Sequence, residues 1–182
     1  MNKNQERKIL ECIAYLAENT QLTDVKTYKL LWLADRLHLG RYARTITGDE
    51  YYAMERGPVP SYVKNLVNRK RVDTKDFDSM FKVEDRAITL IATPGEYDYL
   101  SDSDKMILNM VLAAYGNENE EYLSRISHES PEWKRFEPLL KSGKKKSCKM
   151  IIDDFFEDFQ DPKQLFVRNG EQLIAKSVYY CE

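Results

Sequence analysis

Hydrophobic side chains recur with a helical period in two stretches near the start of the chain. The first stretch predicts an amphipathic helix over residues 4–18, with one buried stripe. The second predicts a helix over residues 24–39, with Thr23 as its N-cap and Gly40 as its end. The apolar residues of this second helix run almost all round its axis, so we expect it to lie at the centre of the core.

The second half of the chain predicts a further series of helices. Ser101 and Asp104 have the spacing of a capping box, and the amphipathic stripe that follows them ends at Gly116. A short helix is predicted around residues 120–126. Ser130, which precedes a proline, is typical of the start of another helix.

The helical period breaks after the central helix. The pattern there predicts a turn over Ile46–Asp49 and an extended segment over Tyr51–Met54. The two prolines of Gly57–Pro60 exclude a helix interior, because proline removes a backbone donor and restricts the residue before it. Ser61 then caps a short predicted helix that reaches Arg69.

The remaining β-structure is predicted in the middle of the chain. Residues 71–79 are polar and read as a loop, and residues 81–93 have the pattern of a hairpin. We expect residues 45–55 and 80–93 to form one small antiparallel sheet. The predicted fold class is therefore α+β, a predominantly α-helical single domain with a small antiparallel β-sheet.

The C-terminal part of the chain has its own local composition. We predict a solvated, lysine-rich loop over residues 141–149 and an acidic, aromatic helix over residues 153–161. A terminal hairpin is predicted to turn at Arg168–Gly170. The predicted organisation is one domain over residues 1–140, with residues 141–182 as a C-terminal extension packed on the same domain.

Composition and charge narrow the function classes. The chain has 182 residues, of which 42% are hydrophobic, enough for a real core. Its 28 basic and 30 acidic residues give a net charge of −2, so a nucleic-acid partner is not expected. The three cysteines, Cys12, Cys148 and Cys181, are too far apart in sequence for a metal motif and argue against a disulfide scaffold. No apolar run approaches the roughly 20 residues of a membrane span, so we expect a cytoplasmic protein.

The central helix carries three polar residues within one turn: Asp35, Arg36 and His38. Asp35 and His38 are three positions apart, so their side chains can meet. They are either an acid/base pair or metal ligands, or they belong to a buried structural motif. In that motif the carboxylate is paired with Arg or His, or accepts backbone donors from the following loop. We favour the structural interpretation for Asp35, Arg36, His38, Asp49 and His128.

His128 is the other histidine, and with Asp35 or Asp49 it offers ligands of the kind that bind metals. No pair of histidines has the spacing that prepares two ligands on one helix face. Packing near Trp133 and capping by Ser127 or Ser130 account for the His128 segment more simply. No nucleophile elbow or glycine-rich phosphate loop is present, so we predict no catalytic residues, no metal and no cofactor.

Two blocks of the chain resemble the Panacea domain family. The first contains Ala34-Asp35-x-x-His38-Leu39, then Ile46-Thr47-Gly48-Asp49, then Ala53-Met54-x-x-Gly57-Pro58-Val59-Pro60. The second runs from Leu100-Ser101-x-x-Asp104 to Tyr115-Gly116 and is followed by Ser127-His128-x-x-Pro131-x-Trp133. The resemblance covers about residues 26–136. One departure is Thr45, where the family more often has proline.

The resemblance implies an antitoxin of a toxin–antitoxin system, of the SocA-like or phage-associated kind connected with phage defence. Such a protein neutralises a cognate toxin, encoded next to it, by direct protein–protein binding. SocA-like members imply an alternative, in which the chain is a proteolytic adaptor that delivers the toxin to a protease. The rival from another class is a hydrolase-type enzyme that uses Asp35, His38, Asp49 and His128. A DNA-binding autoregulator is a third alternative, disfavoured by the charge balance.

The segment after the central helix is the predicted contact site for the toxin. It is rich in the residue types that are enriched at protein interfaces. They are Arg41, Tyr42, Arg44, Tyr51, Tyr52, Met54 and Arg56. Either at least two exposed members of this set touch the toxin, or the tyrosines fill the core and only the arginines remain exposed.

Overall fold

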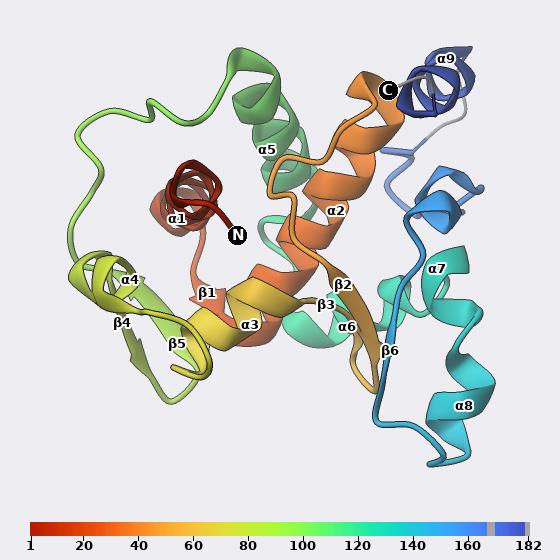
Figure 1. The fold of residues 1–182 in the computed structure, drawn as a ribbon, viewed down its shortest axis with the longest axis horizontal. Helices are drawn as coiled ribbons and strands as arrows, with labels where there is room; N and C mark the ends of the chain where they lie inside the picture. The colour runs from red at the N-terminus through yellow and green to blue at the C-terminus, as the bar shows by residue number, and fades with distance from the viewer. Residues whose placement is uncertain (167–169, 181–182) are drawn as a thin grey trace.

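A single long helix organises the computed structural model, which describes residues 1–166 and 170–180. Helix α2 (Asp24–Tyr42) runs through the middle of the molecule, and every residue from Val25 to Gly40 is buried (Figure 1). The predicted N-cap is confirmed: the Thr23 hydroxyl accepts a hydrogen bond from the Lys26 backbone N–H at 3.2 Å. Helices α1 (Lys3–Asn19), α5 (Asp102–Tyr115) and α6 (Glu120–Ser127) pack against α2. The predicted central position of this helix is confirmed.

Gly40 is not the end of α2. The helix continues to Tyr42, and Ala43 adopts the left-handed conformation, with φ of 57°, while its N–H donates to the Leu39 carbonyl. One glycine weakens a helix by only about 1 kcal/mol. Because Gly40 is buried with the rest of α2, tertiary packing outweighs that cost and the helix ends three residues later than predicted.

One three-stranded antiparallel sheet has the order β1–β5–β4. It contains β1 (Leu22–Thr23) and the predicted hairpin of β4 (Phe81–Glu84) and β5 (Ala87–Leu90). The second sheet has the order β3–β2–β6, formed by three strands. These are β2 (Tyr51–Met54), β3 (Gly57–Pro60) and β6 (Ser147–Lys149). The two sheets lie on different sides of α2 (Figure 1).

The α+β class is confirmed, but the pairing of residues 45–55 with residues 80–93 is wrong. Each segment is in a different sheet, because Tyr51–Met54 pairs with Gly57–Pro60 and with a strand from the lysine-rich segment. Residues 71–79 are also not wholly loop, since α4 (Lys75–Met80) begins inside them.

The short helix after β3 is α3 (Ser61–Val67), and it ends slightly earlier than predicted. Ser61 does not cap it, because Pro60 occupies the cap position and no side chain at that position makes a capping hydrogen bond. The predicted capping box of α5 is confirmed, with Ser101 and Asp104 bonded to each other's backbone N–H.

The chain after α6 forms short elements that lead to β6. Helix α7 (Pro131–Lys134) begins after Ser130, as predicted, and α8 (Glu137–Lys141) follows it. The Ser130 hydroxyl does not cap α7, because it donates to the Ser127 carbonyl at 2.9 Å.

The C-terminal predictions are largely wrong. The acidic, aromatic segment forms only the 3₁₀ helix η1 (Ile152–Phe156), because the Arg36 guanidinium donates hydrogen bonds to the carbonyls of Phe155 and Glu157, at 2.6 and 2.5 Å. The predicted terminal hairpin is replaced by helix α9 (Gly170–Tyr179), which packs on α2. Two residues of its predicted turn, Arg168 and Asn169, lie outside the described residues. Within the described part of the chain, no helix combines the length and apolarity that a bilayer crossing requires.

Candidate functional site

Asp35 holds the loop that follows α2. Its buried carboxylate accepts the backbone N–H groups of Ile46 and Thr47, at 2.7 and 2.9 Å. It also accepts the hydroxyl of Thr47 and, at 2.7 Å, the hydroxyl of Tyr51. Burial raises the pKa of Asp35, and the hydrogen bonds from Thr47 and Tyr51 oppose that rise. Both carboxylate oxygens are therefore fully used in shaping the loop.

Asp49 continues this arrangement and supplies the cap that Ser61 does not. Its carboxylate accepts the N–H groups of Tyr62, at 2.9 and 3.0 Å, and of Val63, at 3.1 Å, in the first turn of α3. Burial raises the pKa of Asp49 to about 6, against the opposing effect of these backbone donors. We call Asp35, Thr47, Asp49 and Tyr51 the loop anchor.

His38 makes a separate cluster with Asp104 at the start of α5. Its Nδ1 lies 2.7 Å from the Arg44 carbonyl, and its Nε2 lies 3.1 Å from the Asp104 carboxylate. Lys8 and Arg44 approach the same carboxylate at 2.6 and 3.0 Å. Burial alone would raise the pKa of Asp104, but the hydrogen bonds from His38 and Lys8 outweigh it and hold this pKa well below its usual value. Asp35 and His38 therefore each make their hydrogen bonds with other residues.

Arg36 links α2 to α7 and η1. Its guanidinium lies 3.4 Å from Glu132, which in turn accepts the indole N–H of Trp32 at 2.9 Å. All three side chains are buried. Burial lowers the pKa of Arg36 and raises that of Glu132, and the charge of each partner opposes the other's shift. This pair fastens the C-terminal segment to the central helix.

The residues of the hydrolase alternative are distributed over separate places. Asp35 and Asp49 hold the loop after α2, His38 lies against α5, and His128 stacks on Trp133 with ring centroids 3.9 Å apart. Over residues 1–166 and 170–180, no three or more His, Cys, Asp or Glu side chains are grouped so that they could hold a metal ion.

The predicted toxin-contact residues are also separated. Tyr51 is buried against Asp35, so its side chain is in the core. Tyr42 is exposed, and Arg44, with a side chain 44% exposed, is tied to Asp104; both lie at the C-terminal end of α2. Arg56, with a side chain 46% exposed, instead pairs with Glu120 at 3.3 Å near the N-terminal end of α2. Arg41, Tyr52 and Met54 are partly buried. The exposed members of this set therefore lie at the two ends of α2 and do not form one surface.

A cavity near Arg56 was missed by the sequence analysis. It has a volume of about 720 Å³ and lies between the β2–β3 turn, α7, α8 and the loop before β6. We call it the lysine cavity. Its lining includes His128, Trp133, Leu140, Lys141, Lys145 and Lys146, together with the carboxylates Glu55 and Glu137. The lysine run itself is the signal in the sequence. Its proximity to His128 arises only from folding, through the pairing of β6 with β2.

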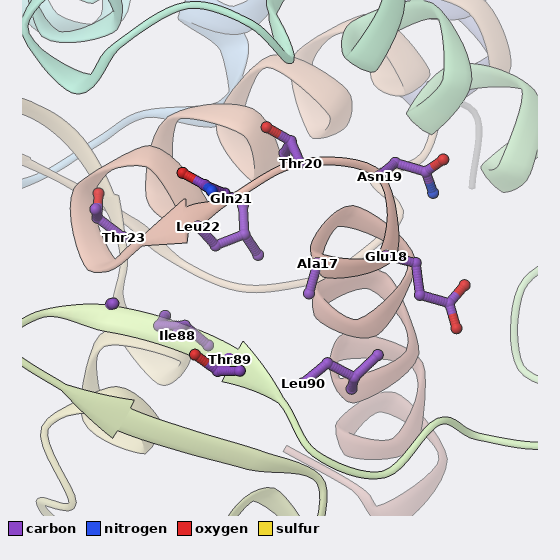
Figure 2. A pocket seen from close by; sticks show the side chains of 11 residues that line it. Ala17, Glu18, Asn19, Thr20, Gln21, Leu22, Thr23, Ile88, Thr89 and Leu90 are labelled. Atoms are coloured by element: carbon purple, nitrogen blue, oxygen red, sulfur yellow. The ribbon is translucent and has the colours of Figure 1, made fainter.

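A second cavity, of about 690 Å³, lies where β1 separates from β5 beside the end of α1 (Figure 2). In Figure 2 the carboxylate of Glu18 points away from β5. The hydroxyls of Thr20 and Thr23 are already bonded, to the Gly116 carbonyl and to Glu120. These two hydroxyls are therefore already used within the fold.

Comparison with known proteins gives one result. The family model described as "Antitoxin SocA-like, Panacea domain" matches residues 28–134, which include the loop anchor, the α5 capping box, His128 and Trp133. No curated protein and no solved structure matches the chain.

Proposed function

Because the chain belongs to the SocA-like antitoxin family with a Panacea domain, we propose that it neutralises a cognate toxin by binding it directly. The observation that carries this proposal is the family match over residues 28–134. The family implies a toxin partner in general, and neutralisation by contact needs no reacting group in this chain.

The use that the fold makes of its polar residues supports a binding role. The carboxylates of Asp35 and Asp49 accept backbone N–H groups, and the carboxylate of Asp104 contacts Lys8, His38 and Arg44. A general base needs an oxygen or nitrogen free to meet a substrate. These carboxylates are instead committed to holding loops and helix ends.

The contact site in this proposal includes the exposed members of the predicted set. Tyr42 and Arg44 lie at one end of α2 and Arg56 at the other. A helix of 19 residues is about 28 Å long, so a small toxin would cover one end more readily than both. We place the contact at the Arg56 end, for the reasons given in the next subsection.

Two alternatives lead to different outcomes in one experiment. An adaptor would remove the toxin by delivering it to a protease, whereas a neutralising partner leaves the toxin intact and bound. A hydrolase would act without forming a lasting complex.

The experiment co-expresses the chain with the product of the adjacent open reading frame and follows growth, toxin level and co-purification. We expect growth to be restored, the toxin level to persist, and the two proteins to purify together. Restored growth with loss of the toxin in a protease-dependent way would favour the adaptor. Restored growth with neither complex nor toxin loss would favour an enzyme, and no restoration would contradict the proposal.

A further inference from the structure

The floor of the lysine cavity is a rigid aromatic platform. His128 stacks on Trp133 with the two rings 21° from parallel. The Trp133 indole N–H donates to the Met54 carbonyl at 2.8 Å, so the pair is fixed to β2. The His128 Nε2 atom is buried and has no hydrogen-bond partner among the described residues. Unpaired buried nitrogen atoms are uncommon, because the folded protein does not replace the hydrogen bond that such an atom makes with water in the unfolded chain.

The lining of the cavity carries three lysines and two carboxylates, Glu55 and Glu137. Lys141 pairs with Glu137 at 2.7 Å, and Lys149, beyond the cavity, pairs with Glu50 at 2.5 Å. Lys145 and Lys146 are exposed and have no ion pair within the described part of the chain. Their loop is nevertheless held in place, since the Lys145 backbone N–H donates to the Leu139 carbonyl at 3.2 Å.

A buried amine of α2 lies near the platform. Lys29 of α2 is buried, and its ammonium group donates to the Pro58 carbonyl at 2.7 Å. Burial is the main cause that holds the pKa of Lys29 well below its usual value, and the positive charge of Arg56 is the second cause. Burial also lowers the pKa of His128, and the nearby Lys29 is the second cause. Burial therefore disfavours the charged forms of Lys29 and His128, so the positive charge of the cavity lies on the exposed lysines of its rim, where Glu55 and Glu137 also line it.

We propose that the lysine cavity docks an acidic segment of the partner protein, with carboxylates against Lys145 and Lys146 and an apolar side chain on Leu140 and the His128–Trp133 platform. Charge complementarity favours this occupant, because the three lysines of the lining outnumber its two carboxylates, and Lys145 and Lys146 have no ion pair among the described residues. The apolar floor favours a peptide segment over a bare anion. This inference rests on the proposed function, since it names the surface by which the toxin would be held.

The direct test measures binding of the full chain to a fluorescein-labelled, glutamate-rich peptide that contains one phenylalanine, at about 0.15 M salt. The variant Lys145→Glu/Lys146→Glu reverses the charge of two lysines on the rim. The control variant Lys70→Glu/Lys82→Glu makes the same change of net charge at exposed lysines outside the cavity. We expect saturable binding to the wild type, about tenfold or greater weakening by the rim variant, and little change by the control.

Three results would overturn the inference. They are equal weakening by both variants, rim-dependent binding of a single-stranded oligonucleotide but not of the peptide, and binding of inorganic phosphate as tightly as of the peptide. The same variants in toxin co-expression separate this inference from the proposed function. If the rim variant still forms the toxin complex, the docking site is wrong and neutralisation by binding stands. If the wild type forms no complex, the proposed function itself fails.

Discussion

The loop anchor and the lysine cavity are both polar regions beside α2. The polar groups of the loop anchor are bonded to one another, whereas several of those in the lysine cavity have no partner among the described residues. In the loop anchor, Asp35 accepts two backbone N–H groups and two hydroxyls, so that both of its carboxylate oxygens are hydrogen-bonded within the protein. In the lysine cavity, His128 has an unpartnered nitrogen, and Lys145 and Lys146 have no ion pair among the described residues. A polar cluster whose groups satisfy one another stabilises a fold. A cluster that leaves them open is available to a partner.

The largest expected effect comes from breaking the loop anchor. Asp35→Asn removes one charged acceptor oxygen and turns an amide donor toward groups that are themselves donors. We expect a loss of about 3 kcal/mol in the free energy of unfolding, measured by urea denaturation. Tyr51→Phe, which keeps the ring and removes one hydrogen bond to Asp35, should cost about 1 kcal/mol. An Asp35→Asn protein as stable as the wild type would show that the anchor does not hold the fold.

The Asp104 cluster should give a smaller and pH-dependent effect. The pKa of Asp104 is lowered in the folded protein, so the ionised form stabilises the fold above the unfolded pKa, about 3.9. This contribution is lost as the pH falls below that value. Asp104→Asn should therefore cost about 2 kcal/mol at pH 7, and the gap to the wild type should shrink toward pH 3.

Asp102 is the matched control, because it is exposed and lies two residues away on the same helix. Asp102→Asn should leave both the stability at neutral pH and its decline in acid close to the wild type. A gap between Asp104→Asn and the wild type that stays constant down to pH 3 would refute the role given to this carboxylate.

The smallest effect on stability should come from the lysine cavity. Lys145→Glu/Lys146→Glu changes two exposed side chains that have no ion pair among the described residues, so we expect unfolding to change by less than about 0.5 kcal/mol. The same variant should weaken partner binding. Loss of stability as large as that of Asp35→Asn would mean that the cavity is a structural element, like the anchor.

The two regions also differ in how far the sequence revealed them. The central helix, the Thr23 cap and the α5 capping box follow from local spacing, and all are present. A carboxylate that accepts donors from the following loop was among the alternatives for Asp35, because loop and helix are adjacent in sequence.

Features that depend on distant contacts were not predictable in the same way. The end of α2 at Tyr42 depends on burial of the whole helix, and η1 is short because Arg36 binds carbonyls more than 100 residues later in the chain. The lysine cavity depends on β6 pairing with β2, which brings the lysine-rich loop to His128. The lysine run alone predicts a solvated loop, since nothing in its local pattern indicates the aromatic platform beneath it.

The most direct test of the account is calorimetric titration of the purified chain with the toxin encoded beside it. We predict a saturable complex for the wild type and for Lys70→Glu/Lys82→Glu. For Lys145→Glu/Lys146→Glu we predict affinity at least about tenfold weaker, with an unchanged melting temperature. A wild-type chain that restores growth in cells but shows no binding in the titration would contradict neutralisation by direct contact.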